Sequence, residues 1–217
     1  MALLAHDFTG ETVLVFGGGR VGARKARHFA SEADVIVVSP AFADAGFADA
    51  ELVRDAPDPD DVREWVARVD PVLVVAATDS AGVNDAAAAA ARDHGALVNR
   101  ADESGGRSAG SVTVPATVED DPVTVAISTG GSSPALAKHL RERVEDEIAG
   151  AGGMAELSGT VREELKAAGV PPEDRRRAVR RLVRAPSVWK ALRTRGANPR
   201  QQAEVVLADE LGEQYTP

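Results

Sequence analysis

The sequence of 217 residues contains no cysteine, which excludes disulfide bonds, thiolate metal sites and cysteine nucleophiles. Aromatic residues make up only 4%, so Ala, Val and Leu must build most of the core. No apolar stretch reaches the roughly 18 residues of a membrane-spanning helix. The start, Met1–Asp7, becomes acidic too quickly for a secretion signal. We therefore expect a cytoplasmic protein.

Lysine is also scarce, since only four of the 25 basic residues are lysine. With 34 acidic residues the net charge is −9, which argues against a general nucleic-acid binder. Hydrophobic residues reach 44%, enough for a packed core. The length allows one large domain or two modest ones.

The first half of the chain alternates short apolar runs with helical patterns. Continuous apolar runs are typical of strands that are covered on both faces, and their alternation with helices indicates a parallel sheet. We therefore predict an α/β domain of the Rossmann type over residues 1–110. Strands are expected at 12–16, 35–38, 51–53, 72–76 and 96–99, and helices at 21–30, 59–68 and 84–94.

The pattern changes after residue 110. Ser111–Pro115 and Pro122–Ile127 alternate with period two and predict an antiparallel pair joined by an acidic loop around residues 119–121. A long helix is expected from Pro134 to Ile148. Residues 149–153 are rich in glycine and predict a flexible break. The remainder reads as helical, punctuated by proline at positions 171, 172, 186 and 199.

A glycine-rich turn follows the first strand and opens the first helix. Gly17, Gly19 and Gly22 fit the G-x-G-x-x-G pattern of dinucleotide-binding domains. Gly17 permits the tight turn, Gly19 lets backbone N–H groups approach a pyrophosphate, and Gly22 lets the helix pack against the strand. Arg20 and Val21 lie at the helix start, whose N–H groups and dipole favour an anion. A tight turn without ligand is the less favoured alternative.

The choice between NAD and NADP depends on the end of the second strand. An acidic residue that binds the ribose is expected there, but the sequence has Ser39 and Pro40. No arginine follows closely in the sequence to bind a 2′-phosphate. We therefore predict NAD as the cofactor.

Four blocks of sequence resemble one known family. They are Gly17–Gly19 with Val21, Arg24 and Lys25; Ala76–Asp79 with Val83 and Asn84; Val98, Asn99 and Asp102; and Ser128–Pro134, continued by Leu136, Ala137 and Leu140–Glu142. The order and spacing of these blocks resemble those of the precorrin-2 dehydrogenase/sirohydrochlorin ferrochelatase family, the N-terminal module of sirohaem synthases. The methyltransferase domain that some bacteria fuse to this module is absent from the sequence.

The resemblance implies NAD-dependent oxidation of precorrin-2 to sirohydrochlorin in sirohaem biosynthesis. In many members insertion of ferrous iron follows, although the histidines show no metal-ligand spacing and no resident metal site is expected. The implied organisation is a Rossmann domain (1–110), a small α+β dimerisation region (111–149) and a C-terminal helical domain (150–217). A homodimer is implied as well.

Asp102 matches the family's catalytic aspartate. It follows the carboxyl end of a strand, where open α/β sheets bind their ligands, and the oxidation needs a base for a proton. Glu103 is the rival base, and a solvated loop aspartate is the alternative without a functional role. Around the cofactor we expect Ala77, Thr78 and Asp79 beside the nicotinamide ribose, although Thr78 and Asp79 also suit a helix N-cap. Asn99 is either a cofactor ligand or a turn residue.

The implied substrate carries many carboxylates, so an acidic protein must offer it local positive charge. The loop Ser128, Thr129, Gly130, Gly131 and Ser132 precedes a helix with Ser133 as N-cap and Pro134 at the first helical position. Arg100 and Arg107 lie near Asp102 in the sequence. Alternatively, carboxylates bind a helix face of arginines, which is otherwise a solvated or nucleic-acid-binding face: Arg177, Arg180, Arg181 and Arg184.

Two other functions remain open from the sequence alone. One is a non-catalytic subunit that binds NAD and passes on a signal, which would need neither Asp102 nor the loop at 128–132. The other is an enzyme of different scope, either a relative that only inserts metal or another small Rossmann reductase. The short-chain reductases are excluded, because the only tyrosine is Tyr215 and no Tyr-x-x-x-Lys pair exists.

Overall fold

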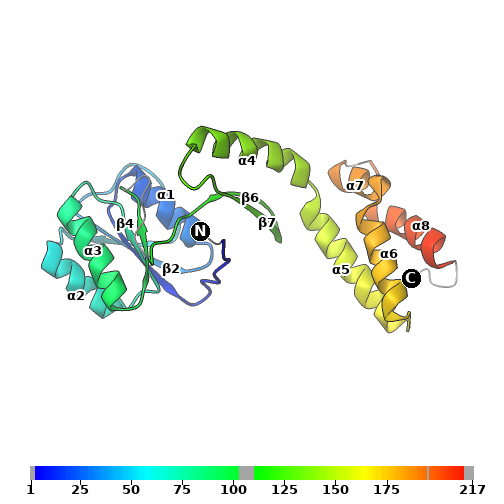
Figure 1. The fold of residues 1–217 in the computed structure, drawn as a ribbon, viewed down its shortest axis with the longest axis horizontal. Coiled ribbons are helices and arrows are strands. Elements are labelled where there is room, and N and C mark those ends of the chain that lie inside the picture. The colour runs from blue at the N-terminus through cyan, green and yellow to red at the C-terminus, as the bar shows by residue number, and fades with distance from the viewer. Residues whose placement is uncertain (1–2, 103–109, 195, 213–217) are drawn as a thin grey trace. The chain divides into compact units, whose positions relative to one another are not determined.

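The structure, a computed structural model, describes residues 3–102, 110–194 and 196–212 (Figure 1). The chain divides into two compact units. One comprises Met1–Val114 with Gly130–Ser132, and the other comprises Pro115–Thr129 with Ser133–Pro217. The three-part division at residues 110 and 149 stays a prediction.

The first unit is built on a parallel sheet of five strands. These are β1 (Thr12–Phe16), β2 (Asp34–Ser39), β3 (Glu51–Arg54), β4 (Leu73–Ala76) and β5 (Leu97–Arg100). Their order in the sheet is β3-β2-β1-β4-β5, with every neighbouring pair parallel. The chain order therefore reverses beside β1, between β2 and β4. Open α/β sheets bind ligands outside the carboxyl ends of their strands at such a switch point. The Rossmann-type prediction is confirmed.

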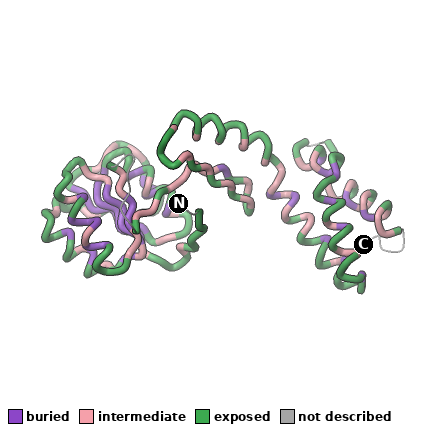
Figure 2. The backbone as a smooth tube through the Cα atoms, in the orientation of Figure 1, coloured by how far each residue is buried: buried purple, intermediate pink, exposed green. Residues whose placement is uncertain are grey.

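Helices cover both faces of this sheet. Leu14 and Phe16 of β1 face the core beneath α2 (Pro59–Val69) and α3 (Ala81–Asp93). Val13 and Val15 point to the opposite face, where they join the buried residues of α1 (Arg20–Phe29). Figure 2 shows the strands as a buried layer inside this unit. Burial on both faces explains why the strands read as continuous apolar runs.

The prediction of a strand at Ser111–Pro115 is wrong. This segment makes a single parallel bridge, from Ser111 to Val98 of β5, and places Val112 and Val114 against the α1 face of the sheet. The antiparallel pair consists instead of β6 (Ala116–Asp120) and β7 (Val123–Ile127). Of the acidic residues that were expected to form the loop, Glu119 and Asp120 therefore belong to β6, and Asp121 lies in the turn. Alternation alone does not distinguish a strand from an extended segment that packs one face on a sheet.

The second unit continues with five helices in the described part of the chain. They are α4 (Pro134–Ile148), α5 (Ala151–Ala167), α6 (Pro172–Val183), α7 (Pro186–Arg193) and α8 (Pro199–Leu211). Proline occupies the first turn of α4, α6, α7 and α8, where its missing N–H costs nothing. The prediction of a helical remainder punctuated by prolines is confirmed. Within the described residues, no helix is long and apolar enough to span a bilayer.

The expected flexible break at residues 149–153 is shorter than predicted. Gly150 adopts φ +86°, but Gly152 and Gly153 lie inside α5. A Cβ at Gly152 would lie 2.2 Å from the carbonyl oxygen of Asp121, and its N–H donates to the Asp120 carboxylate over 3.2 Å. This glycine is therefore a close contact between α5 and the β6–β7 turn, and not a sign of flexibility.

Candidate functional site

The glycine turn after β1 is packed tightly against its neighbours. Gly17 has φ +115°, and a Cβ there would lie 2.4 Å from the carbonyl oxygen of Ala77, the residue after β4. A Cβ at Gly22 would lie 1.8 Å from the carbonyl oxygen of Gly17. These contacts are with backbone atoms, which cannot give way cheaply. Gly17 and Gly22 are therefore required by the turn itself.

Gly19 differs, because a Cβ there would meet nothing within 4 Å. Gly19 is the N-cap of α1, no side chain caps that helix end, and Gly19, Arg20 and Val21 are exposed. The helix start thus offers backbone N–H groups to an open space beside the switch point. This arrangement fits the pyrophosphate of a dinucleotide, which Gly19, Arg20 and Val21 would hold.

An arginine of β3 lies beside the end of β2, although no arginine follows Ser39 closely in the sequence. Arg54, at the end of β3, is paired in register with Ser39 and donates to the carbonyl oxygen of Pro40 over 3.0 Å. Its guanidinium also lies over the ring of Phe42, 5.6 Å from the centroid. The Ser39 hydroxyl donates to the carbonyl oxygen of Ala41 over 2.8 Å. Strand pairing brings Arg54 here, so sequence proximity could not reveal it.

The loop after β4 is held by a buried asparagine. The Asn84 Oδ1 accepts from the backbone N–H of Thr78 over 3.2 Å and from the Thr78 hydroxyl over 2.7 Å. Its Nδ2 donates to the Thr78 carbonyl oxygen over 2.9 Å. Asn84 is 1% exposed. The N-cap of α3 is Ser80, and not Thr78 or Asp79 as the sequence suggests. Asp79 is exposed.

Asn99 lies within β5 and is not a turn residue. Its Nδ2 donates to the carbonyl oxygen of Val112 over 2.8 Å. Its Oδ1 is buried and finds no hydrogen-bond donor among the residues that the structure describes. Because an unpaired buried acceptor is costly, this atom is a candidate for contact with a ligand.

Asp102 follows β5 and is bound by Arg100. The guanidinium donates from Nε and from its terminal nitrogen to the two carboxylate oxygens, over 2.9 and 2.8 Å. These hydrogen bonds, with a smaller contribution from Asn84, lower the pKa of Asp102 to about 2. The Arg100 guanidinium also contacts Asp85 on α3, over 2.7 Å. At neutral pH the carboxylate is therefore ionised and held in one orientation.

Lys25 lies on α1, next to the buried face of that helix. Its side chain is half-buried, and burial together with the nearby charge of Arg24 lowers the pKa of the ammonium group to about 8. No acidic side chain pairs with it in the described part of the chain. A charge in such a place costs stability unless a ligand or partner compensates for it.

The loop before α4 forms part of a capped helix start. The Ser133 hydroxyl accepts from the N–H of Leu136 over 3.2 Å, which confirms Ser133 as the N-cap. The Thr129 hydroxyl bridges to the backbone of Ser133. Gly130 and Gly131 both adopt positive φ, at 64° and 84°. Binding of substrate by Ser128, Thr129, Gly130, Gly131 and Ser132 stays a prediction.

Two predicted residues lie outside the described part, namely Arg107 as a substrate ligand and Glu103 as the rival base. Among the described residues, no group of three or more histidine, aspartate or glutamate side chains is arranged to hold a metal ion.

The first unit brings together the turn at 17–22, the loop 77–79, Asn99, Arg100 and Asp102 at one edge of its sheet. This edge defines the unit as a dinucleotide-binding Rossmann domain.

Comparison with known proteins places the chain in a family. A model of the family described as "Putative NAD(P)-binding" matches residues 4–116, and a second, "Sirohaem biosynthesis protein central", matches residues 120–147. Because the first match covers more than half of the sequence, the chain belongs to this NAD(P)-binding family. The prediction of a dinucleotide cofactor is thereby confirmed at the level of NAD(P).

Individual relatives agree with this family. The siroheme synthase of Methylococcus capsulatus is 35% identical over 94% of the chain, and the chain spans 42% of that relative. The precorrin-2 dehydrogenase of Methanosarcina barkeri is 27% identical, over 96% of the chain and 94% of the relative. The solved structure titled "SirC, precorrin-2 dehydrogenase" superposes with a TM-score of 0.64 at 21% identity, covering 94% of this chain and all of that one. That likeness confirms the fold.

Proposed function

We propose that this chain oxidises precorrin-2 to sirohydrochlorin, with NAD as the acceptor, in sirohaem biosynthesis. The observation that carries the proposal is the position of Asp102. An ionised carboxylate, fixed by Arg100 and linked to Asn84, lies at the same sheet edge as the glycine turn. The choice of substrate is supported by the precorrin-2 dehydrogenase that matches this chain over nearly the full length of both.

The chain's residues divide the work of such an oxidation. Gly19, Arg20 and Val21 would hold the pyrophosphate, and Thr78, ordered by Asn84, would border the nicotinamide ribose. The chemistry that bound NAD would supply is acceptance of the hydride. Asp102 takes the accompanying proton on a carboxylate oxygen, while Arg100 keeps that carboxylate oriented. The hydride and the proton together account for the two electrons and two hydrogens that the substrate loses.

NAD is proposed over NADP because the cation beside Ser39 is already engaged. Arg54 donates to the Pro40 carbonyl and lies over Phe42, so a 2′-phosphate would have to compete for it. Ser39 stands in place of the acidic residue that would repel such a phosphate, which weakens the discrimination between the two cofactors. We therefore expect a preference for NAD that is moderate in size, with kcat/KM about tenfold higher than for NADP.

We also propose a homodimer and a cytoplasmic location, where NAD is supplied. The two-stranded sheet β6–β7 is too small to be stable alone, and α4 buries none of its residues. Leu136 and Leu140 of α4 are 47% and 37% exposed. A second copy of this region would cover them. Whether ferrous iron is then inserted as a second substrate is a separate question for the assay.

The test mixes the purified protein with precorrin-2 and NAD without metal, and follows the absorbance of sirohydrochlorin and NADH. Both products should appear together in equal amounts. The variant Asp102→Ala should bind NAD normally but lose about 10²–10⁴-fold in kcat. Absence of turnover despite NAD binding would favour a sensor or a chelatase-only protein. Ferrous iron or cobalt, added afterwards, decides whether the chain is also a chelatase.

A further inference from the structure

Helix α6 carries arginines on two faces that differ in their partners. On the face toward α8, Arg177 pairs with Glu210 over 2.6 Å and with Asp174 over 2.9 Å. On the same face Arg181 lies 3.8 Å from Asp209. Arg177 is therefore paired with two carboxylates, whereas the contact of Arg181 is longer and exposed. Of the arginine face 177, 180, 181 and 184 that the sequence suggests, Arg177 and Arg181 therefore contact α8, whereas Arg180 lines a pocket on the other face.

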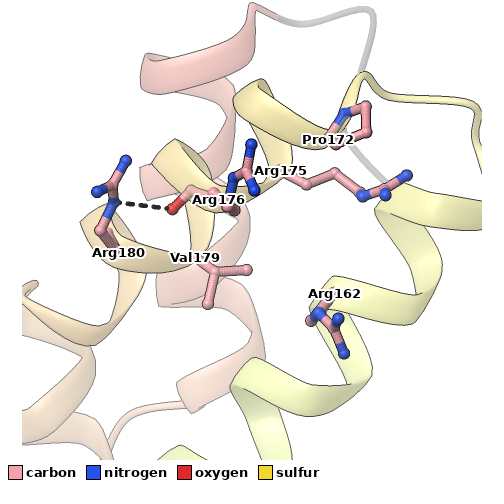
Figure 3. Close-up of a pocket in the computed structure, with 6 residues that line it drawn as sticks. All are labelled: Arg162, Pro172, Arg175, Arg176, Val179 and Arg180. Atoms are coloured by element: carbon pink, nitrogen blue, oxygen red, sulfur yellow. Dashed lines mark hydrogen bonds between the residues drawn. The ribbon is translucent and has the colours of Figure 1, made fainter.

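The other face of α6 borders an open pocket of about 420 Å³ (Figure 3). Arg162 of α5 lies on one side of the pocket, and three arginines of α6, together with Pro172 and Val179, lie on the other. Counted from Pro172, the other α6 residues lie three, four, seven and eight positions further along, which places them on one helical face. The lining residues are Arg162, Pro172, Arg175, Arg176, Val179 and Arg180.

The arginines of this pocket keep most of their charge free. Arg175 donates to the carbonyl oxygen of Val170 over 3.0 Å, and Arg180 to that of Arg176 over 3.2 Å. Neither has a carboxylate partner among the described residues. The other two have only weak contacts with exposed glutamates, Arg162 with its neighbour Glu163 at 3.7 Å and Arg176 with Glu173 at 3.3 Å. Exposed pairs of this kind hold a cation loosely.

In a chain of net charge −9, four clustered arginines without firm acidic partners are unusual. Guanidinium groups bind carboxylates with two parallel hydrogen bonds. Pro172 and Val179 add an apolar surface between the cations, where a flat ring system can lie. The pocket volume is in the range of small-molecule sites. Nucleic acid would need a longer basic track than this short cluster between two helices.

We propose that this pocket binds a carboxylate-rich tetrapyrrole at a second site, in the helical part of the chain. The arginines pair with carboxylate side chains of the macrocycle, and Pro172 and Val179 contact its rings. The choice of ligand rests on the proposed function, whereas the pocket's preference for polycarboxylates rests on its own residues. The site holds the substrate or product without taking part in the oxidation.

The test compares three forms of the full-length chain. Arg175→Gln/Arg180→Gln removes the two cations without carboxylate partners. Arg177→Gln/Arg181→Gln, the matched control, removes the same charge from the same helix on its paired face. Each protein is titrated with uroporphyrin, a stable carboxylate-rich porphyrin, and the bound equivalents per chain are counted by equilibrium dialysis. Oxidation of precorrin-2 is measured in parallel, and circular dichroism checks the fold.

We expect the wild type and the control to bind one equivalent per chain more than the pocket variant, or to bind this equivalent about tenfold more tightly. Arg175→Lys/Arg180→Lys should restore part of the binding, because it keeps the charge but not the paired hydrogen bonds. Turnover of precorrin-2 should change less than about twofold in the pocket variant. Higher salt should weaken the extra site.

Equal binding by the pocket variant and the wild type would overturn the second site, even if precorrin-2 is oxidised. Equal loss in both double variants would also overturn it, since general electrostatic attraction would then suffice. Displacement of uroporphyrin by an equal concentration of citrate would overturn the tetrapyrrole assignment. Conversely, an extra equivalent lost only in the pocket variant supports the site, even if the chain does not oxidise precorrin-2.

Discussion

Arg100 holds Asp102 by two parallel hydrogen bonds, of 2.9 and 2.8 Å, at the carboxyl end of β5. The pairing links the residue proposed as the base to one predicted to bind substrate carboxylates. Because Arg100 also contacts Asp85, its charge is shared between two acids before any substrate arrives. Within this arrangement Arg100 is a positioning residue for the base.

Removing Arg100 should change the pH dependence of the oxidation. In the wild type the pKa of Asp102 is about 2, so the base stays ionised through all of the ordinary assay range. In Arg100→Gln the carboxyl loses the hydrogen bonds that lower its pKa while burial still raises it, so the pKa of Asp102 should rise. The loss of kcat/KM on acidification should therefore begin at a higher pH than in the wild type. Initial rates between pH 4 and pH 8 measure this shift.

The matched control is Asp85→Asn, which removes the other partner of Arg100 and leaves its pair with Asp102. Its acid limb should follow the wild type. If the limb of Arg100→Gln also stays in place, Asp102 is not the base that titrates. The proton would then be taken elsewhere, with Glu103 as the first residue to test.

Asn84 should matter for both the cofactor loop and Asp102. Asn84→Ala removes three hydrogen bonds to Thr78 and leaves the partly buried backbone N–H of Thr78 without its acceptor. The unpaired group should lower the free energy of unfolding by about 1–3 kcal/mol and loosen the loop that borders the cofactor. We expect a higher KM for NAD together with a lower kcat.

The control for Asn84 is Ser80→Ala, which removes the N-cap of the same helix but none of the contacts with Thr78. Ser80→Ala should lower the free energy of unfolding by about 1 kcal/mol, with little change in KM for NAD. Urea unfolding and steady-state kinetics separate the two effects. Similar kinetics in both variants would show that Asn84 acts only through the stability of α3.

The glycine turn offers a pair of substitutions with opposite expected results. Gly22→Ala places a Cβ against the carbonyl oxygen of Gly17 and should destabilise the first unit by about 3 kcal/mol or more. Gly19→Ala meets open space with an ordinary φ of −73° and should leave stability unchanged within about 0.5 kcal/mol. Because its methyl group occupies the pyrophosphate's approach, Gly19→Ala should weaken NAD binding about tenfold.

Thermal unfolding and titration calorimetry with NAD measure the two effects separately. The two variants add the same methyl group to the same turn, so each controls for the other. Normal NAD affinity in a folded Gly19→Ala variant would move the pyrophosphate away from the start of α1.

The proposed dimer predicts that two leucines of α4 matter only for assembly. Leu136→Ser/Leu140→Ser should shift the sedimentation coefficient from dimer to monomer, because these exposed side chains would lose a partner's apolar surface. The control is Val205→Ser on α8, which removes a side chain that is 63% exposed. A wild type that sediments as a monomer at micromolar concentration would contradict the proposal.

Much of the first unit could be predicted from the sequence, because its signals are local. The apolar run Thr12–Phe16 coincides with β1, and Gly17, Gly19 and Gly22 follow it in the order that the turn requires. Pro134, Pro172, Pro186 and Pro199 likewise mark the first turns of their helices. These features depend on neighbouring residues, so a single sequence contains them.

The features that the sequence could not supply depend on contacts between distant residues. Arg54 reaches Pro40 only through the pairing of β2 with β3. The contact of Asn84 with Thr78 depends on where α3 begins, and the helix was expected to begin only at Asn84 itself. Ser111–Pro115 alternates like a strand, yet its apolar side chains cover the sheet from the α1 face. Periodicity reports which side chains are buried but not what buries them.

Lys25 provides a prediction about stability and pH. In the folded chain the pKa of its ammonium group is about 8, against about 10.4 in an unfolded chain. At pH 7 the folded state must therefore keep a charge in a half-buried place, which costs about 1–3 kcal/mol. Lys25→Met should remove this cost and stabilise the first unit by that amount at pH 7.

The stability difference between the wild type and Lys25→Met should depend on pH. Between pH 8 and pH 10 the unfolded chain binds more protons at Lys25 than the folded chain, so the wild type gains stability as the pH rises. The advantage of Lys25→Met should therefore shrink at pH 9.5. Urea unfolding at pH 7 and at pH 9.5 measures this stability difference in a Trp189→Phe background, where Trp65 on α2 reports on the first unit. Lys138→Met, at an exposed position of α4, should stabilise the second unit at neither pH, as read from Trp189 in a Trp65→Phe background. An advantage that is equal at pH 7 and pH 9.5 would mean that the gain comes from packing of the methionine and not from removal of a buried charge.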